Sequence, residues 1–214
     1  MVVLRKKMKH NIQTINTIIF DLGGVLIDWN PRYVYRTIFD SEEEVEWFLN
    51  NVCTSEWNER QDEGYLLVKA TEELIAKFPE WEKEISAYYG RWIEMLGGPI
   101  EETVEIFRQL KKNTALKIYA LTNWSAELFP IALDRYDFLH WFDGRVVSGE
   151  EKTRKPFPEF YQILLDRYSI DPGHAVFIDD NLRNIKGGEE EGITGIHFQN
   201  SRLLVTSLNE MEIL

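Results

Sequence analysis

Two short runs of apolar residues have the pattern of buried β-strands. The first is Thr-Ile-Ile-Phe at positions 17–20, and the second is Ala-Val-Phe-Ile at positions 175–178. Continuous β-branched and aromatic residues are typical of a strand that is covered on both faces, as in a parallel sheet. Three more segments are candidate strands of the same sheet: residues 116–121, 144–147 and 193–198.

Helical patterns separate these strands in the second half of the chain. Residues 100–112 repeat apolar side chains at helical spacing, with acidic residues early and lysines late, an order that suits the helix dipole. Residues 159–168 and 182–191 have similar patterns. Strands that alternate with helices predict an α/β fold with a doubly wound, Rossmann-like, mostly parallel sheet.

The stretch from Arg32 to Gly98 has a different composition, rich in Glu, Trp and Tyr, and shows no obvious strand. Ser41 followed by three glutamates is typical of a helix start, and residues 71–78 have helical spacing. The sequence Leu-Gly-Gly-Pro at 96–99 indicates a break. We therefore expect a helical cap, residues 31–98, inserted into an α/β core formed by residues 1–30 and 99–214.

Composition and charge exclude several classes of protein. The formal net charge is −12, which argues against nucleic-acid binding through a basic face but allows a small anionic ligand in a locally positive site. No apolar run reaches the ~18 residues of a membrane span. The only cysteine, Cys53, excludes an internal disulfide. Residues 1–10 are basic without a following signal-length apolar stretch, so we expect a cytoplasmic protein.

Two acidic segments that follow strands could carry chemistry. Asp21 precedes Leu22 and two glycines, whose amides could approach an anion, although a simple turn explains the segment equally well. The adjacent carboxylates of Asp179 and Asp180 repel each other unless a cation offsets their charge. Such oxygen-rich clusters suit Mg²⁺. A helix cap by Asp180 or Asn181 is the simpler alternative.

Two further segments are weaker signals on their own. Thr122 and Asn123 end a predicted strand and could donate hydrogen bonds to a phosphate, but this pair is also an ordinary helix entry. Lys155 precedes a proline that holds it out of helical geometry. In a doubly wound sheet Asp21, Thr122 and the Asp179–Asp180 pair fall at the carboxyl ends of the strands, where ligands bind.

In this order, the four segments resemble the motifs of the haloacid dehalogenase-like (HAD) hydrolase superfamily. Asp21 matches its nucleophile, Thr122 its hydroxyl, Lys155 its basic residue and the Asp179–Asp180 pair its acidic motif. The resemblance extends from about residue 16 to 198 and places a helical cap between the first two motifs. The pattern is similar to that of sugar-1-phosphate (glucose-1-phosphatase-like) phosphatases and of the phosphatase domain of soluble epoxide hydrolases.

The resemblance implies a Mg²⁺-dependent phosphatase that acts on a small phosphorylated metabolite. Asp21 would attack phosphorus, and Lys155 would neutralise phosphate charge. Thr122 and the backbone amides of Leu22 and Gly23 would bind the transferring oxygens, with Asn123 nearby. The implied metal ligands are the Asp21 carboxylate, the Gly23 carbonyl, Asp180, and Asp179 directly or through water.

One position departs from the family pattern. The second aspartate that usually follows the nucleophile by two residues, the general acid and base, is replaced by Gly23. Either water or a cap side chain such as Asp62 or Glu63 supplies the proton, or the substrate has a good leaving group. Otherwise the protein is a weak catalyst whose role is to bind phosphorylated ligands or to act as a regulatory protein. A 2-haloacid dehalogenase is a further alternative, against which the acids at 179 and 180 argue.

The cap should determine substrate choice, because a helical cover excludes water and bulky substrates. We expect Trp57, Arg60 and Asp62 to contribute to specificity, with plain packing as the alternative for Trp57. The Trp-rich cap also leaves open an association surface. The sequence determines neither the substrate nor the oligomeric state.

Overall fold

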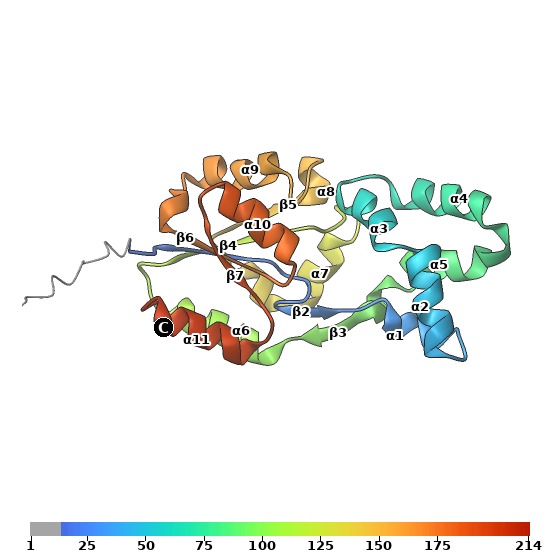
Figure 1. Ribbon diagram of the computed structural model, residues 1–214, viewed down its shortest axis with the longest axis horizontal. Helices are drawn as coiled ribbons and strands as arrows, with labels where there is room; N and C mark the ends of the chain where they lie inside the picture. Colours follow the sequence, from blue (N-terminus) through green and yellow to red (C-terminus); the bar gives the residue numbers. More distant parts are fainter. Residues whose placement is uncertain (1–13) are drawn as a thin grey trace, which may run out of the picture.

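The computed structural model describes residues 14–214, and its centre is a five-stranded parallel sheet (Figure 1). The strand order is β5-β4-β1-β6-β7. The strands are β1 (Thr17–Phe20), β4 (Lys117–Thr122), β5 (Gly144–Val147), β6 (Ala175–Asp179) and β7 (Thr194–His197). All five predicted strands are present, which confirms the α/β, doubly wound fold. The basic segment at residues 1–10 lies outside the described residues.

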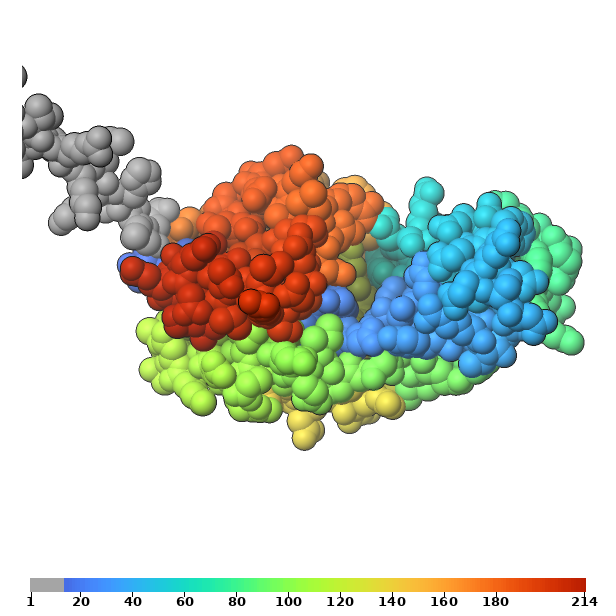
Figure 2. Space-filling view, turned by 60° about the horizontal axis from the view of Figure 1, so that its bottom comes forward, coloured from blue at the N-terminus to red at the C-terminus, as the bar shows by residue number. Residues whose placement is uncertain are grey.

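Helices cover both faces of this sheet because its strands are apolar on both sides. Along β1, Ile18 and Phe20 pack into one core cluster and Ile19 into the other. The first face carries α6 (Glu101–Leu110), α7 (Phe129–Arg135) and α11 (Ser201–Glu210), and the second carries α9 (Pro158–Tyr168) and α10 (Leu182–Glu190). Figure 2 shows α6 and α11 side by side on the surface. The C-terminal helix α11 has no counterpart among the predicted elements.

The cap forms a separate group of helices beside the sheet (Figure 1). It consists of α1 (Arg32–Tyr35), α2 (Glu42–Asn51), α3 (Ser55–Asp62), α4 (Leu67–Lys77), α5 (Glu82–Gly90) and short 3₁₀ turns. The helix start at Ser41 is confirmed, since its hydroxyl accepts from the Glu44 amide in a capping box. Aromatic side chains fill the interior; the Tyr35 and Phe48 rings, for example, lie 4.9 Å apart.

The expectation of no strand between residues 32 and 98 is wrong. Residues Leu96–Pro99 form β3, which pairs antiparallel with β2 (Ile27–Trp29) at the base of the cap. Main-chain hydrogen bonds hold such a ribbon, so the glycines that indicated a break do not prevent it. At Gly97 a Cβ atom would lie 2.3 Å from a carboxylate oxygen of Asp28, so this glycine permits close approach within the ribbon.

Polar contacts attach the cap to the core at the C-terminal end of α3. The Ser148 hydroxyl, at the start of α8 (Ser148–Glu151), donates to the Asp62 carbonyl. Glu59 pairs with Arg154 at 2.9 Å and also with Arg183. We call this pair of bridges the α3 latch. Within residues 14–214, no helix has both the length and the apolar character needed to cross a membrane.

Candidate active site

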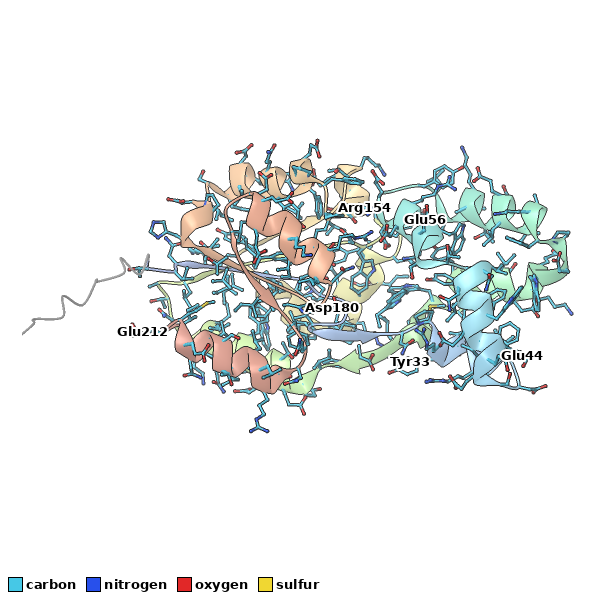
Figure 3. All side chains as sticks on the ribbon, viewed as in Figure 1. Tyr33, Glu44, Glu56, Arg154, Asp180 and Glu212 are labelled. Atoms are coloured by element: carbon cyan, nitrogen blue, oxygen red, sulfur yellow. The ribbon has the colours of Figure 1, made fainter. Side chains whose placement is uncertain are left out.

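The sheet topology brings the predicted motif residues to one edge. Strands β4 and β6 flank β1 on either side in parallel, so their carboxyl ends are adjacent. Asp21 directly follows β1, Thr122 ends β4, and Asp179 ends β6. In Figure 3, Asp180 lies at this edge and Arg154 lies between the core and the cap.

A buried lysine ties two of these carboxylates together. Lys155 Nζ lies 2.9 Å from Asp21 Oδ1 and 2.6 Å from Asp179 Oδ2, with none of the lysine exposed. The Asn123 side chain fixes the lysine backbone: its Oδ1 accepts from the Lys155 amide at 2.9 Å, and its Nδ2 donates to the Lys155 carbonyl at 3.0 Å. Asn123 therefore positions the lysine, although it also borders the cavity described below.

Asp179 is surrounded by hydrogen-bond donors. Its Oδ1 accepts from the Asn181 amide at 2.7 Å, and both of its oxygens accept from Asn184 Nδ2 at 3.1 Å. Together with the bond from Lys155, these contacts satisfy a carboxylate that would otherwise be costly to bury. The sequence interpretation missed Asn184; its place in the first turn of α10, close behind the acidic pair, was the only signal for it.

The three acids at this edge form a candidate metal centre. One oxygen from each of Asp21, Asp179 and Asp180 can be chosen so that all lie within 4.8 Å of one another. Gly24 borders the group, because a Cβ atom there would lie 2.2 Å from Asp180 Oδ2 and its φ is +74°. The Asp180 carboxylate therefore occupies space that only glycine leaves free.

The electrostatics of the cluster favour a cation. Burial raises the pKa of Asp21 well above its usual range; Lys155 opposes the rise, and the charges of Asp179 and Asp180 add to it. Burial and Asp179 also raise the pKa of Asp180. One lysine thus faces three carboxylates at one edge. Hard oxygen donors of this kind fit Mg²⁺, whose charge would favour their ionised forms.

Two buried donors near the acids have no protein partner. The Thr122 hydroxyl and the Trp124 indole nitrogen are both buried, and neither has a hydrogen-bond partner among residues 14–214. Buried polar atoms without a partner are uncommon, and donation to a bound ligand is one explanation for these two. The Leu22 amide, by contrast, donates to Asp21 Oδ1 at 2.7 Å and so orients that carboxylate.

A cavity of about 70 Å³ lies between this edge and the cap. It is lined by Gly23, Trp29, Asn58, Asp62, Trp92, Asn123, Trp124 and Leu128. Three indole rings and a leucine make most of the lining apolar, while two amides and one carboxylate supply polarity. No atom lies within 4 Å of the position a Cβ would take at Gly23.

The other predicted cap residues lie elsewhere. Trp57 and Arg60 line a different cavity of about 360 Å³ within the cap. Trp57 packs edge-on against Tyr88 with 5.1 Å between ring centroids, which supports the packing alternative. Arg60 lies over the Tyr65 ring. Neither side chain borders the cavity at the acidic edge, because the helical register of α3 turns them away from Asn58 and Asp62.

The chain is similar to several known proteins. The chain is 27% identical, over 92% of its length and 97% of the relative's, to a sesquiterpene phosphatase from Aspergillus oryzae. It is 24% identical to a phosphorylated carbohydrates phosphatase from Thermotoga maritima, over 94% of this chain and 90% of that one. The crystal structure of a HAD family enzyme from Bacteroides thetaiotaomicron, in complex with magnesium and inorganic phosphate, superposes with a TM-score of 0.63 at 23% identity. That likeness covers 86% of this chain and 94% of the other and concerns the fold.

A family model described as haloacid dehalogenase-like hydrolase matches residues 15–192. This span includes the sheet edge with Asp21, Thr122, Lys155, Asp179 and Asp180, as well as the whole cap. Because the match covers most of the chain and the matched residues converge in space, the chain belongs to the haloacid dehalogenase-like hydrolase family.

Proposed function

We propose that the protein is a Mg²⁺-dependent phosphatase of small phosphomonoesters, sugar phosphates among them, that forms a phosphoryl intermediate on Asp21. One observation carries the proposal: Lys155 is wholly buried between Asp21 and Asp179 at the same edge as Asp180. A buried lysine that leaves one oxygen of an aspartate free suits nucleophilic attack on an anionic phosphate. Two of the similar proteins named above are phosphatases, which supports this choice.

The residues around the phosphate would have distinct roles. The free oxygen of Asp21 attacks phosphorus, and the bond between phosphorus and the leaving oxygen breaks. Water then attacks the phosphoryl group, and the bond from phosphorus to Asp21 breaks. Lys155 offsets the charge of the phosphate while it holds Asp21 in place. The Thr122 hydroxyl and the Gly23 amide donate to the transferring oxygens.

The metal would be held by the Asp21 and Asp180 carboxylates and the Gly23 carbonyl. When bound, Mg²⁺ supplies positive charge that lets an anionic carboxylate approach an anionic phosphate. Asp179 would act mainly by fixing Lys155, because lysine and amide donors already surround its oxygens.

The cap, residues 31–98, would set the size and character of the leaving group. The cavity is small, so a compact ester suits it better than a phosphoprotein. Its indole rings would face an apolar side of the leaving group, while Asn58 and Asp62 would face oxygen atoms. This combination is compatible with a sugar phosphate.

The test is phosphate release from a panel of small phosphomonoesters, with Mg²⁺ and with a chelator. We expect Mg²⁺-dependent turnover by the natural protein and none by the Asp21→Asn variant. Equal phosphate release from both proteins would contradict the proposal. Halide release from 2-haloacids, measured in parallel, separates the dehalogenase alternative, and metal binding without turnover of any ester would favour a binding or regulatory protein.

A further inference from the structure

The proposed reaction needs a proton at the leaving oxygen, and the strand edge does not supply one. An alkoxide is a poor leaving group unless an acid protonates it as the bond to phosphorus breaks. Gly23, two residues after Asp21, has no side chain to do so. Lys155 is held by two carboxylates, which raise its pKa although burial lowers it, so it remains charged and is a poor acid.

The cavity beside Gly23 contains a single titratable side chain. Of its eight lining residues, only Asp62 can lose a proton near neutral pH; the others are tryptophans, asparagines, leucine and glycine. Asp62, from the cap, and Gly23, from the core, therefore line the same cavity.

Contacts from both the core and the cap fix the position of Asp62. The Ser148 hydroxyl donates to its carbonyl and so holds this end of α3 against the core. Within the cap, Asn58 Nδ2 donates to Asp62 Oδ2 at 2.9 Å, and the Tyr89 hydroxyl donates to Asn58 Oδ1 at 3.0 Å. This chain of hydrogen bonds orients the carboxyl group, as an acid–base residue requires.

The surroundings of Asp62 raise its pKa into the neutral range. Burial raises the pKa of Asp62 to about 7, and the Glu59 charge adds to the rise; Arg154, the Ser125 amide and Lys155 act in the opposite direction. The tyrosines at 88 and 89 also face it and are neutral, since burial raises their pKa values. Both protonation states of Asp62 are therefore populated near pH 7, as acid–base catalysis requires.

We propose that Asp62 is the general acid and base of this enzyme and acts from the cap in place of the carboxylate missing at Gly23. The inference rests on the proposed phosphatase function. In the first step the Asp62 carboxyl gives its proton to the leaving oxygen as Asp21 displaces it. In the second step the Asp62 carboxylate takes a proton from the water that attacks phosphorus, which restores the acid. The products are the alcohol and inorganic phosphate.

The neighbouring candidate, Glu63, is less suited to this role. Its carboxylate lies 3.5 Å from Arg154 Nε, and it does not line the cavity. Glu63→Gln therefore serves as the matched control, since it removes an adjacent acid from the same end of the cap helix.

The experiment compares two phosphorylated compounds of similar size, the ester ethyl phosphate and the mixed anhydride acetyl phosphate. Acetate leaves without a proton, whereas ethoxide needs one. In Asp62→Asn we expect kcat/KM for ethyl phosphate to fall by about 10²–10⁴-fold and for acetyl phosphate by less than about tenfold. The Glu63→Gln protein should hydrolyse both compounds with the same kcat/KM as the natural protein. Adding Gly23→Asp to Asp62→Asn should restore turnover of ethyl phosphate, since a Cβ atom at position 23 would meet nothing within 4 Å.

A pH profile of the unmodified protein provides a readout that does not depend on a variant. The kcat/KM for ethyl phosphate, which reports only the first step, should decline above about pH 7, because the acid form of Asp62 is lost, while kcat/KM for acetyl phosphate should not follow that decline. An equal loss of kcat/KM for both compounds in Asp62→Asn, no loss for ethyl phosphate, or superimposable pH profiles would overturn the role of Asp62. If the natural protein hydrolyses neither compound nor any phosphomonoester in the panel, the proposed function itself fails, which is a distinguishable result.

Discussion

The acidic edge of the sheet and the end of α3 in the cap, which we call the sheet wall and the cap wall of the site, are built on different principles. On the sheet side, Asp21, Lys155 and Asp179 are buried and hold one another by ion pairs of 2.6–2.9 Å. On the cap side, Asp62 is oriented by neutral hydrogen bonds from asparagine and serine and has no lysine or arginine within salt-bridge distance among the described residues. A paired charge suits a nucleophile and a phosphate, whereas an unpaired carboxyl group in a poorly solvated position suits proton transfer.

Removal of the proposed nucleophile is the strongest test of this difference between the sheet wall and the cap wall. Asp21→Asn should lower phosphate release by more than about 10⁴-fold, because an amide cannot form the phosphoryl intermediate. The fold should remain, since Lys155 keeps its bond to Asp179 and one of the mutually repelling carboxylates disappears. Steady-state kinetics and thermal unfolding measure the two effects. Activity retained within about tenfold would show that the sheet wall does not supply the nucleophile.

Removing the central cation should affect stability as well as activity. Lys155→Met leaves the buried carboxylates of Asp21 and Asp179 without a counterion, so we expect a loss of about 3–5 kcal/mol in the free energy of unfolding. Activity should fall by at least about 10²-fold. Lys117→Met is the control: its ion pair with Asp143 is exposed, and we expect a change below about 1 kcal/mol. Denaturant titration of both variants decides whether burial makes the difference.

The two adjacent glycines allow a sharp test of the metal centre. In Gly24→Ala the new Cβ would clash with the Asp180 carboxylate and would occupy a positive φ, so we expect Mg²⁺ affinity to fall about tenfold or more. Gly23→Ala meets no atom within 4 Å and should leave Mg²⁺ affinity nearly unchanged. Calorimetric titration with Mg²⁺ measures both. Equal affinities in the two variants would place the ion away from Asp180.

The smallest effect is expected at the α3 latch. Glu59→Gln removes the charge that pairs with Arg154 and Arg183, so the end of α3 should exchange its amide hydrogens faster and KM should change by a few-fold. Glu42→Gln is the matched control, because Glu42 pairs with Arg36 inside the cap and exchange in α3 should not change. If the amides of residues 55–62 exchange at the same rate in Glu59→Gln as in the natural protein, the α3 latch does not hold the cap.

The sequence predicts the sheet wall much better than the cap wall. Continuous apolar runs ending in acids, such as 17–20 before Asp21, identify both the strands and the edge at which the acids meet. A helix pattern, by contrast, tells which side chains share a face but not which face meets the core. In α3, contacts with the distant residues Ser148 and Arg154 settle that question, so Asp62 borders the cavity while Trp57 and Arg60 do not.

Two other features had no adequate sequence signal. Strand β3 contains two glycines and a proline and exists because β2 lies opposite it. The amides of Asn123 and Asn184 serve Lys155 and Asp179, a role that depends on tertiary packing and not on local pattern. Polar residues that position charged ones are therefore the part of this site that required a structure.

The central claim is that the Asp21 carboxylate becomes phosphorylated during turnover. The most direct measurement is acid quenching of the protein during Mg²⁺-dependent hydrolysis of a phosphomonoester, followed by mass spectrometry of its peptides. The peptide that contains Asp21 should gain the mass of one phosphoryl group, and the Asp21→Asn protein should gain none. Phosphorylation of a different residue, or an identical gain in the Asp21→Asn protein, would contradict the claim.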